Sequence, residues 1–353
     1  MNYARESVFT GAIRSLCKTF AGTVGILLGV VLLILILTFS SGPDFMPEKC
    51  EIRIAPDSKG ETELLSRTSP AILRINFHGI IGEGDLTEEK IENVLSDSRI
   101  DFLNNNRVKG IFLHMNTPGG EATNADGIYR ALMRYKEKHH VPIYAYIDGL
   151  CASGGMYISA AADKIYCSPT SVAGSIGIIL GPTFNFSGAM DKIGIQSLTM
   201  TRGKDKDMLN PFRPWKEGED ASLQDILANL YEQFVSVMVA GRPKLTKEKL
   251  TNEYGAQVYI ASKAMELGYV DEGNSNYYKA LQDLTITAGI QPDQKYQVVE
   301  LSVHRSFLAD LAQGKSPLFS GKLVHGFNFG PGLSSEMSGK FLYLYQPMPS
   351  EKF

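Results

Sequence analysis

The chain has 353 residues, which is long enough for a sizeable core and one or two domains. Apolar residues make up 44% of it and charged residues 21%, as in ordinary globular proteins, and the net charge of −3 argues against nucleic-acid binding. Four scattered cysteines without a CxxC pair give no disulfide framework and no sign of a metal site, so we expect no metal and no cofactor. Small buried thiols are the simplest interpretation, with a bond between Cys151 and Cys167 left open.

The N-terminal region contains the first strong pattern in the sequence, a long apolar run. Residues 20–39 hold no charge and would span about 30 Å as a helix, the thickness of the hydrocarbon core of a bilayer. Arg5, Arg14 and Lys18 precede this run against Glu6 alone, which favours a cytoplasmic N-terminus and an exported remainder. A cleaved signal peptide is the alternative, but the apolar run is long and the cleavage site weak, so we expect a retained anchor.

Beyond the anchor, polar residues 41–69 contain three prolines and predict a linker. From residue 70 onward, apolar runs that predict strands alternate with segments of helical spacing, and Thr87 is a plausible N-cap of the first helix after the linker. The predicted strands cover 71–81, 108–115, 143–147 and 163–168, and the predicted helices cover 86–103, 121–138 and 153–162.

The second half of the chain begins with a glycine-flanked loop leading into a strand at 171–180. Residues 219–240 predict the clearest helix, whose apolar stripe is either core or a subunit contact. Residues 259–273 predict a short strand, a helix and a turn, and after about residue 275 the pattern weakens into an extension with a few short strands. This alternation predicts an α/β layer of repeated ββα or βαβ units.

A glycine-bearing turn follows the strand predicted over 108–115. In the sequence NTPGG, Pro118 fixes one dihedral angle, and Gly119 and Gly120 can adopt conformations closed to other residues. Because a helix follows, free backbone N–H groups should point out of the turn, as an oxyanion-binding site requires. Taken alone, PGG is more often an ordinary tight turn.

A single serine occupies the equivalent position after the next strand. Ser153 lies between small residues in DGLCASGGMY, where a substrate backbone can approach closely. A lone serine there is usually a helix N-cap. Here two glycine-rich turns follow two apolar strands, and the carboxyl ends of such strands are where ligands bind in open α/β sheets. A serine beside N–H donors predicts acyl transfer.

A serine nucleophile needs a base. The six histidines give little support for one: none lies between residues 141 and 303, His139 and His140 end a polar helix, and His114 is most simply a packed residue. Lysine is the other available base, provided that burial lowers its pKa. Lys204 and Lys206 lie in TMTRGKDKDMLNPFRP, which by itself is typical of a solvated charged loop, and Ser175 in SVAGSIG can hold a neutral lysine by hydrogen bonding.

Taken together, these stretches resemble the signal peptide peptidase A family, also called protease IV, of the Clp protease/crotonase fold. Five pieces occur in the order of the family and cover about residues 70–273, behind a membrane anchor as in the family. These pieces are NTPGG, DGLCASGGMYISAAADKIY, AGSIG, RGKDKDMLNPFRP and YIASKAMELGYVDE. This chain has one copy of the core, so it resembles the short form, and Met156 departs from the family by replacing a commoner aromatic residue.

The resemblance implies a serine endopeptidase with a Ser/Lys dyad that degrades signal peptides. Ser153 matches the nucleophile, Lys206 the general base, and Ser175 the serine that supports the lysine. Gly120, with Gly119 beside it, matches the oxyanion loop, and the N–H of Gly154 is a second donor. The short form further implies a homo-oligomeric ring of protomers in which the serine and the lysine meet across a subunit boundary.

The predicted organisation follows from these signals. We expect a single-pass protein of the bacterial cytoplasmic membrane, with its catalytic part on the extracytoplasmic side and an α/β core of the Clp protease/crotonase type. Its parts are a cytoplasmic N-terminus (1–19), a transmembrane anchor (20–40), a linker (41–69), a protease core (70–275) and a C-terminal extension (276–353). Two alternatives remain: an acyl-CoA-handling enzyme of the crotonase type, and a catalytically inactive membrane-anchored scaffold.

Overall fold

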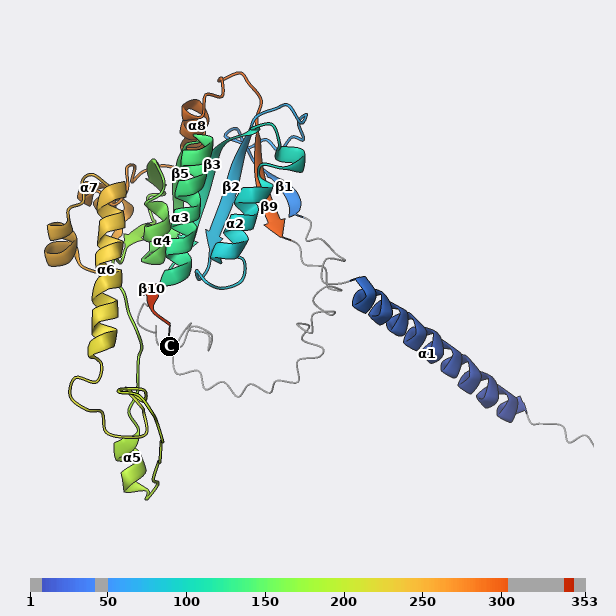
Figure 1. The fold of residues 1–353 in the computed structure, drawn as a ribbon. Coiled ribbons are helices and arrows are strands. Elements are labelled where there is room, and N and C mark those ends of the chain that lie inside the picture. Colours follow the sequence, from blue (N-terminus) through green and yellow to red (C-terminus); the bar gives the residue numbers. More distant parts are fainter. Residues whose placement is uncertain (1–7, 42–49, 304–339, 346–353) are drawn as a thin grey trace, which may run out of the picture. The chain divides into compact units, whose positions relative to one another are not determined.

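The computed structural model describes residues 8–41, 50–303 and 340–345, and they fall into two compact units. The first contains α1 (Val8–Ser41), drawn in dark blue in Figure 1. Within it, Gly11–Leu33 is long and apolar enough to cross a membrane, with a mean hydropathy of 2.0. Length and composition of this kind belong to a membrane anchor or to a signal sequence, the two alternatives that the sequence left open.

The second unit is built on one large mixed sheet. Its strand order is β1-β9-β2-β3-β5-β7-β8, and β6 pairs with β5 beside this path. The neighbours from β9 to β7 run parallel, as does β6, whereas β8 is antiparallel to β7. The strands are β1 (Cys50–Ala55), β2 (Ala71–His78), β3 (Val108–Thr117), β5 (Ile143–Ala152), β6 (Lys164–Cys167), β7 (Val172–Gly174), β8 (Val258–Ile260) and β9 (Gln297–Val303).

Helices cover both faces of this sheet, which explains why its central strands are continuous apolar runs. Residues such as Leu73 and Leu113 pack on one face beneath α2, α3 and α4, whereas Ile72 and Phe112 pack on the other against α8 (Figure 1). The mixed α/β class predicted from the sequence is therefore confirmed. The helices are α2 (Glu88–Asp97), α3 (Ala122–His139), α4 (Gly154–Ser159), α5 (Ser187–Lys192), α6 (Ala221–Gly241), α7 (Ala261–Leu267) and α8 (Tyr277–Thr287).

The local signals of α2 are confirmed in detail. Thr87 is its N-cap, and the Thr87 hydroxyl accepts a hydrogen bond from the Lys90 N–H at 3.4 Å. Ile91, Val94 and Leu95, the residues predicted to face the core, are its buried residues. The helix is shorter than the predicted 86–103, because a separate 3₁₀ turn forms the last part of that segment.

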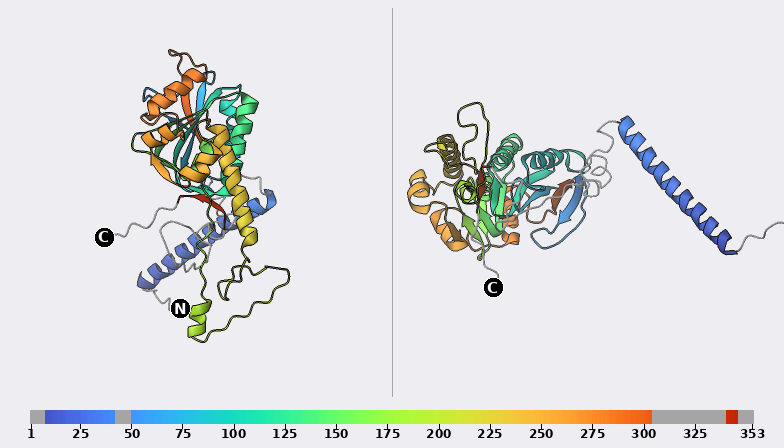
Figure 2. Two further views of the ribbon diagram at one scale, coloured as in Figure 1. Left: turned by 90° about the vertical axis from the view of Figure 1, so that its left-hand side faces the viewer. Right: turned by 90° about the horizontal axis from the view of Figure 1, so that it is seen from below.

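The apolar stripe of α6 divides into two halves. Phe234 and Met238, in the C-terminal half, are fully buried, and α6 contacts α4. In the N-terminal half Ile226 is 41% exposed, because this half extends beyond the sheet and its covering helices (Figure 2). Half of the stripe is therefore core, and for the exposed half the subunit contact stays a prediction.

Residues 276–303, which the sequence places in an extension, complete the sheet instead. β9 pairs in parallel with β2, and α8 packs on β3 and β5. β1, inside the predicted linker, lies beside β9. A short edge strand and an isolated amphipathic helix give weak sequence signals because their burial depends on partners far away in sequence. Residues 304–339 and 346–353 of the predicted extension lie outside the described residues.

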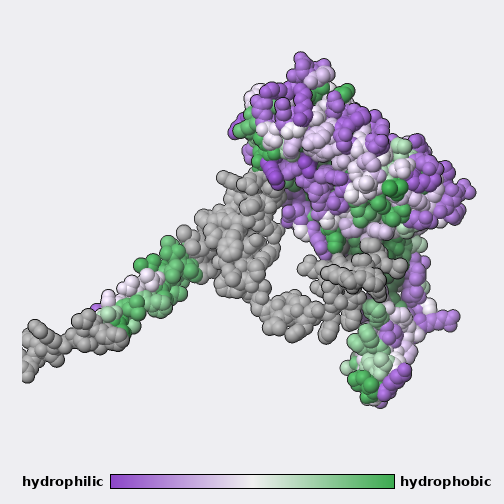
Figure 3. Space-filling view, turned by 180° about the vertical axis from the view of Figure 1, so that it is seen from behind, coloured by the Kyte–Doolittle hydropathy of each residue, from purple (hydrophilic) through white to green (hydrophobic). Residues whose placement is uncertain are grey.

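Two smaller features matter for the site. β4 (Gly119–Glu121) follows β3 and precedes α3, so that β3, β4 and α3 form one ββα unit of the predicted kind, and β4 pairs with β10 (Leu342–Leu344) in a separate two-stranded sheet. The segment 180–217, here called the projecting loop, carries α5 and extends away from the sheet (Figures 1 and 2). Its exposed apolar side chains are among those that form green surface in Figure 3.

Candidate active site

Three neighbouring parallel strands end at one edge of the sheet, and each carries one predicted site element. The register pairs Thr117 of β3 with Cys151 of β5, and Ala152 of β5 with Gly174 of β7. The PGG turn, Ser153 and Ser175 therefore follow three adjacent strands at their carboxyl ends, where ligands bind in parallel sheets. The structure thus brings together the three glycine-bearing turns that the sequence singled out.

Ser153 has a strained backbone conformation. Its φ is 54° and its ψ is −115°, a region that residues other than glycine rarely adopt. The residue stands at the N-cap position of α4, but its hydroxyl makes no capping hydrogen bond. Instead the Ser153 Oγ lies 3.4 Å from the carbonyl oxygen of Gly177, and the Ser153 N–H donates to Gly174 O at 2.9 Å. The capping alternative therefore does not account for this serine.

The predicted oxyanion glycines converge beside Ser153. A Cβ added to Gly154 would lie 3.3 Å from the Gly120 nitrogen, so these two backbones are neighbours. A Cβ on Gly120 would lie 2.0 Å from the carbonyl oxygen of Ile81, which leaves no room for a side chain. Gly154 is the first residue of α4, where N–H groups have no partner within the helix. Gly120 and Gly154 are therefore placed to offer N–H groups to one oxygen.

Gly119 contributes differently from the prediction. Its φ of +96° is in the region that favours glycine, and its N–H donates to the hydroxyl of Thr117 at 3.0 Å. Because the Gly119 N–H is hydrogen-bonded to the Thr117 hydroxyl, we infer that Gly119 stabilises the turn. The sequence offered a signal for this bond, since a threonine two residues earlier often caps a turn through its hydroxyl.

Ser175 follows β7 as Ser153 follows β5. It is 6% exposed, its φ is 58°, and its N–H donates to the carbonyl oxygen of Gln257 at 2.7 Å. The peptide before it supplies Gly174 O, which accepts the Ser153 N–H. Ser153 and Ser175 are thus linked through one peptide group at the ends of paired strands.

Lys206 lies elsewhere, in the projecting loop, where it is exposed. Among the described residues, no hydrogen bond or ion pair joins its ammonium group to Ser153 or Ser175. Lys204 is 93% exposed and lies 3.9 Å from an Asp205 carboxylate oxygen. Within one chain, then, the structure assembles the serine and the glycines but does not place either lysine against them.

The charged stretch around Lys206 is held by an arginine that the sequence analysis missed. Arg213 binds Asp207 at 2.8 Å and Glu219 at 2.6 Å. The hydrogen bond from Arg213 lowers the pKa of the Asp207 carboxyl below its ordinary value. Because these residues lie in a segment of turns without regular secondary structure, no periodicity could have revealed the cluster.

None of the four histidines among the described residues is hydrogen-bonded to Ser153. His114, in β3, is 12% exposed and packs against His78 and Tyr146, as predicted for a packed residue. Burial, with a smaller contribution from Arg74, lowers the pKa of His114 to about 3, so its imidazole is neutral at pH 7. His304 and His325 lie outside the described residues.

Two of the cysteines, Cys151 and Cys167, are buried thiols, as expected, whereas Cys17 of α1 is exposed. Cys151 and Cys167 are free, and burial raises the pKa of the Cys151 thiol to about 12, which leaves no thiolate for nucleophilic attack. Within the described part of the chain, no cluster of histidine, cysteine or carboxylate side chains is arranged to hold a metal ion.

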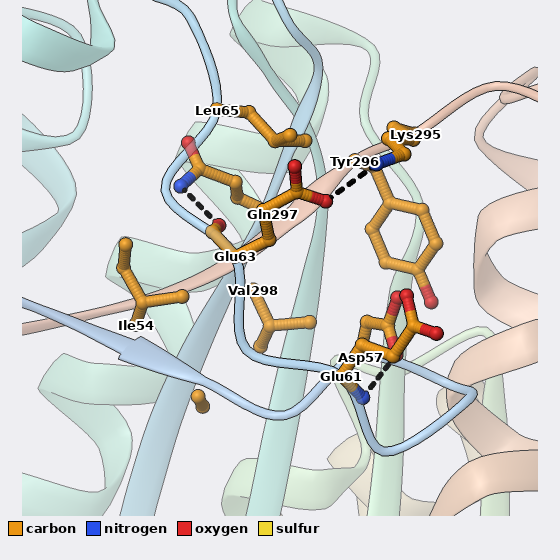
Figure 4. A pocket seen from close by; sticks show the side chains of 10 residues that line it. Ile54, Asp57, Glu61, Glu63, Leu65, Lys295, Tyr296, Gln297 and Val298 are labelled. Carbon is orange, nitrogen blue, oxygen red and sulfur yellow. Dashed lines mark hydrogen bonds and ion pairs between the residues drawn. The ribbon is translucent and has the colours of Figure 1, made fainter.

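A cavity elsewhere in the unit is too small for a substrate. It lies beside the edge strand β1 and its neighbour β9 and has a volume of about 20 Å³, room for about one water molecule (Figure 4). Glu63 and Lys295 form an ion pair of 2.6 Å there, and the Gln297 amide donates to Glu63 O at 2.9 Å. These contacts tie the residues before β2 to β9 and belong to the structural framework.

Comparisons with known proteins found one family match and several relatives. The model of peptidase family S49 matches residues 135–291, which include Ser153, Ser175 and Lys206. A putative signal peptide peptidase SppA of Enterococcus faecium is 29% identical over 70% of this chain and 75% of its own length. A putative protease of Methanocaldococcus jannaschii is 33% identical over 54% of this chain and 60% of its own length.

Among solved structures, a point mutant of ClpP1 from Listeria monocytogenes is similar to 59% of this chain and 94% of its own, with 15% identity and a TM-score of 0.38. The family match spans α4, β7, the projecting loop and α6–α8, and thus includes the strand ends that carry both serines. Over residues 135–291 the chain is similar to peptidase family S49, and over 70% of its length it is similar to an SppA-like relative.

Proposed function

We propose that this protein is a membrane-anchored serine endopeptidase in which Ser153 is the nucleophile. The observation that carries the proposal is the convergence of three elements at one sheet edge: a strained, buried serine and two glycine backbones beside it. A hydroxyl next to paired N–H donors is the arrangement that acyl transfer needs. We assign the donors to Gly120 and Gly154, and we assign to Gly119 the role of shaping the turn.

The base in this proposal is Lys206 of a neighbouring protomer. Within one chain Lys206 is exposed on the projecting loop, whose surface is unusually apolar for a segment in water. A ring of protomers would bury this surface and desolvate the lysine, and desolvation lowers a lysine pKa towards neutrality. Ser175, adjacent to Ser153, would then orient the amine. The exposed apolar residues are Phe184, Phe186, Ile193, Ile195, Leu198, Met200, Phe212 and Trp215.

The chemistry proceeds in two halves. Neutral Lys206 accepts the proton of Ser153, whose oxygen attacks the substrate carbonyl while the negative charge develops against the glycine N–H groups. The resulting ammonium then donates its proton to the leaving amine, and water, activated by the same lysine, releases the acyl group from Ser153.

The substrate class follows from the anchor and from the relatives. The Enterococcus relative is named a putative signal peptide peptidase, and α1 would hold this catalytic unit at a membrane surface. We therefore propose that the substrates are cleaved signal peptides and similar membrane-proximal peptides. The positive charges before the span favour a catalytic part on the extracytoplasmic side of the bacterial cytoplasmic membrane.

The test is covalent labelling of the full-length chain by a fluorophosphonate, followed by a peptide-hydrolysis assay. We expect the wild type to be labelled and Ser153→Ala to remain unlabelled, because the probe reacts only with an activated serine. Equal labelling of both would remove Ser153 from the mechanism. An acyl-CoA enzyme would instead bind an acyl-CoA and hydrolyse no peptide, and an inactive scaffold would do neither.

A further inference from the structure

Lys206 lies in a run of tight turns of the projecting loop. The Lys206 N–H donates to Gly203 O at 3.4 Å, and the Met208 N–H donates to Asp205 O at 3.0 Å. Leu209 has a φ of 54°, a left-handed conformation that a bulky side chain rarely adopts. Such a backbone persists only where surrounding contacts hold it, so this turn needs an anchor outside its own few residues.

Arg213 is that anchor. Its Nη2 atom donates to the backbone carbonyl oxygen of Asp207 at 2.7 Å, and its Nε atom donates to the Asp207 carboxylate at 2.8 Å. The same guanidinium donates to both carboxylate oxygens of Glu219, at 2.6 and 3.3 Å. Glu219 lies two residues before α6, and its side chain is 3% exposed. One side chain therefore joins the residue after Lys206 to the start of α6, through the planar arrangement of donors that arginine has and lysine lacks.

Arg213 also determines which cation the Asp207 carboxylate meets. In the sequence, Lys206 stands between two carboxylates, Asp205 and Asp207. In the structure, the Asp205 carboxylate is 3.9 Å from the Lys204 ammonium, and the Asp207 carboxylate is bound by Arg213. Within the described ranges, no ion pair involves Lys206 itself. Both neighbouring carboxylates thus have a partner other than the proposed base.

The two carboxylates that Arg213 binds are ionised at neutral pH. Hydrogen bonds from Arg213 lower the pKa of Asp207 and that of Glu219 below their ordinary values. Lys216 is a second cation that acts on Asp207, so two cations stand against two carboxylates in this cluster. From α6, the neutral Ser222 hydroxyl contacts the same turn. The other charged residues beside the turn are Arg202, Lys204, Asp205 and, at the start of α6, Asp220.

A carboxylate left beside Lys206 would act against its proposed role. An anion within about 4–6 Å of an amine favours the protonated form and raises the pKa of the amine. The proposed assembly would remove water from the lysine, and charge–charge interactions grow stronger as water is excluded. Asp207, one residue away, would then hold Lys206 as the ammonium, and Ser153 would lose its base.

From these contacts we infer that Arg213 is a positioning residue of the catalytic site: it fixes the turn that carries Lys206 and keeps the Asp207 carboxylate away from the Lys206 amine. The inference rests on the proposed function, in which Lys206 is the base. Arg213 acts through Asp207 and touches neither the substrate nor the nucleophile. Loss of Arg213 should therefore shift the pH range in which the enzyme works, which the loss of a purely structural contact would not do.

The test is the pH profile of kcat/KM for peptide hydrolysis by the full-length, assembled enzyme. Its acid limb reports the ionisation of the essential base in the free enzyme. Arg213→Gln removes the cation and leaves the Asp207 carboxylate, so the pKa of Lys206 rises and the neutral amine forms only at higher pH. We expect the midpoint of the limb to move up by about one pH unit, with about a tenfold loss of kcat/KM on its acid side. An unmoved midpoint would overturn the inference.

Two further variants identify the carboxylate as the cause. Arg213→Gln/Asp207→Asn should return the midpoint to the wild-type value, because the anion is gone. Asp207→Asn alone should leave the midpoint in place, since Arg213 already binds that carboxylate, and this variant tests the inference even if Arg213→Gln does not assemble. Arg202→Gln, which removes an exposed cation from the same loop, is the matched control and should not move the midpoint. A double variant that stays shifted, or an Asp207→Asn midpoint lower by about one unit, would contradict the inference.

Lys206→Ala separates this inference from the proposed function. If Lys206→Ala hydrolyses the peptide as well as the wild type does, the proposed base is wrong and the inference fails with it. If Lys206→Ala is inactive and Arg213→Gln lowers activity equally at every pH, Lys206 stands as the base and the inference alone fails. An inactive Lys206→Ala together with the shifted limb of Arg213→Gln supports both.

Discussion

The sheet edge that carries Ser153 and the projecting loop that carries Lys206 differ in nearly every physical respect. The first is buried, tied to its neighbours by backbone hydrogen bonds and packed so tightly that Gly120 admits no side chain. The second is exposed and apolar and has a single short helix. The proposed nucleophile and its proposed N–H donors are thus pre-organised within one chain, whereas the proposed base requires a neighbour to complete its environment.

The largest effect is expected at Ser153. Ser153→Ala should lower kcat for peptide hydrolysis by at least about 10⁴-fold, as removal of a nucleophile does in other acyl-transfer enzymes. Its thermal midpoint should not fall, because the lost hydroxyl makes one long hydrogen bond of 3.4 Å. An active Ser153→Ala enzyme would show that the chemistry lies outside this sheet edge.

Substitutions of the two lysines in the projecting loop, Lys206 and Lys204, provide a test variant and its matched control. Lys206→Ala should lower kcat about 10²–10⁴-fold, the usual contribution of a general base. Lys204→Ala should stay within about twofold of the wild type, because an exposed ion pair contributes little. Steady-state kinetics on the two variants decides between them, and the reverse pattern would assign the base to Lys204.

The next largest effect on kcat is expected at the proposed oxyanion loop. Gly120→Ala should cost about 10²–10³-fold in kcat, the effect of losing one donor. The added methyl group would collide with the Ile81 backbone, so the loop must move. Gly188→Ala, in α5 of the projecting loop where nothing lies within 4 Å, is the control and should keep full activity. Unchanged kinetics in Gly120→Ala would remove this glycine from the donor set.

The apolar surface of the projecting loop is tested by a charge. Leu198 is 87% exposed in one chain, and Leu198→Asp would place a carboxylate in any interface formed there. We expect a smaller assembly by light scattering and lower activity. Leu64→Asp, at a position 74% exposed ahead of β2, should keep the assembly intact. If Leu198→Asp leaves the assembly unchanged, the loop is not the interface.

The smallest effect is expected at Thr117. Thr117→Val keeps the shape but removes the acceptor of the Gly119 N–H, and leaving such a buried donor unpaired costs about 1–3 kcal/mol of stability. Urea denaturation measures the loss, with the exposed Thr68→Val as a control near zero. No loss at Thr117 would mean that the turn finds another acceptor.

The sequence predicted the strand ends well because their signals are local. A glycine at positive φ, an apolar strand and a following helix can each be read from a few adjacent residues, and PGG and Ser153 combine all three. Thr87 as an N-cap and the core residues of α2 were predictable for the same reason.

The remaining features depend on partners far apart in sequence. β9 is a strand only beside β2, and the buried position of Tyr343 depends on Tyr157 and Phe234, more than a hundred residues earlier. The bond between the Gly119 N–H and Thr117 was missed, because a threonine two residues before a glycine is only a general signal and does not say which N–H group its hydroxyl accepts. The role of Lys206 stays a prediction, because its partner groups would belong to another protomer.

The central claim is that Ser153 and Lys206 act together across a protomer boundary, and complementation tests it most directly. Full-length Ser153→Ala and Lys206→Ala chains are co-expressed, and the mixed assembly is assayed against each variant alone and against the doubly substituted chain. We expect the two single variants to be inactive alone and the mixture to regain peptide hydrolysis, because some boundaries join an intact serine to an intact lysine. A mixture as inactive as its components, beside an active wild type, would contradict it.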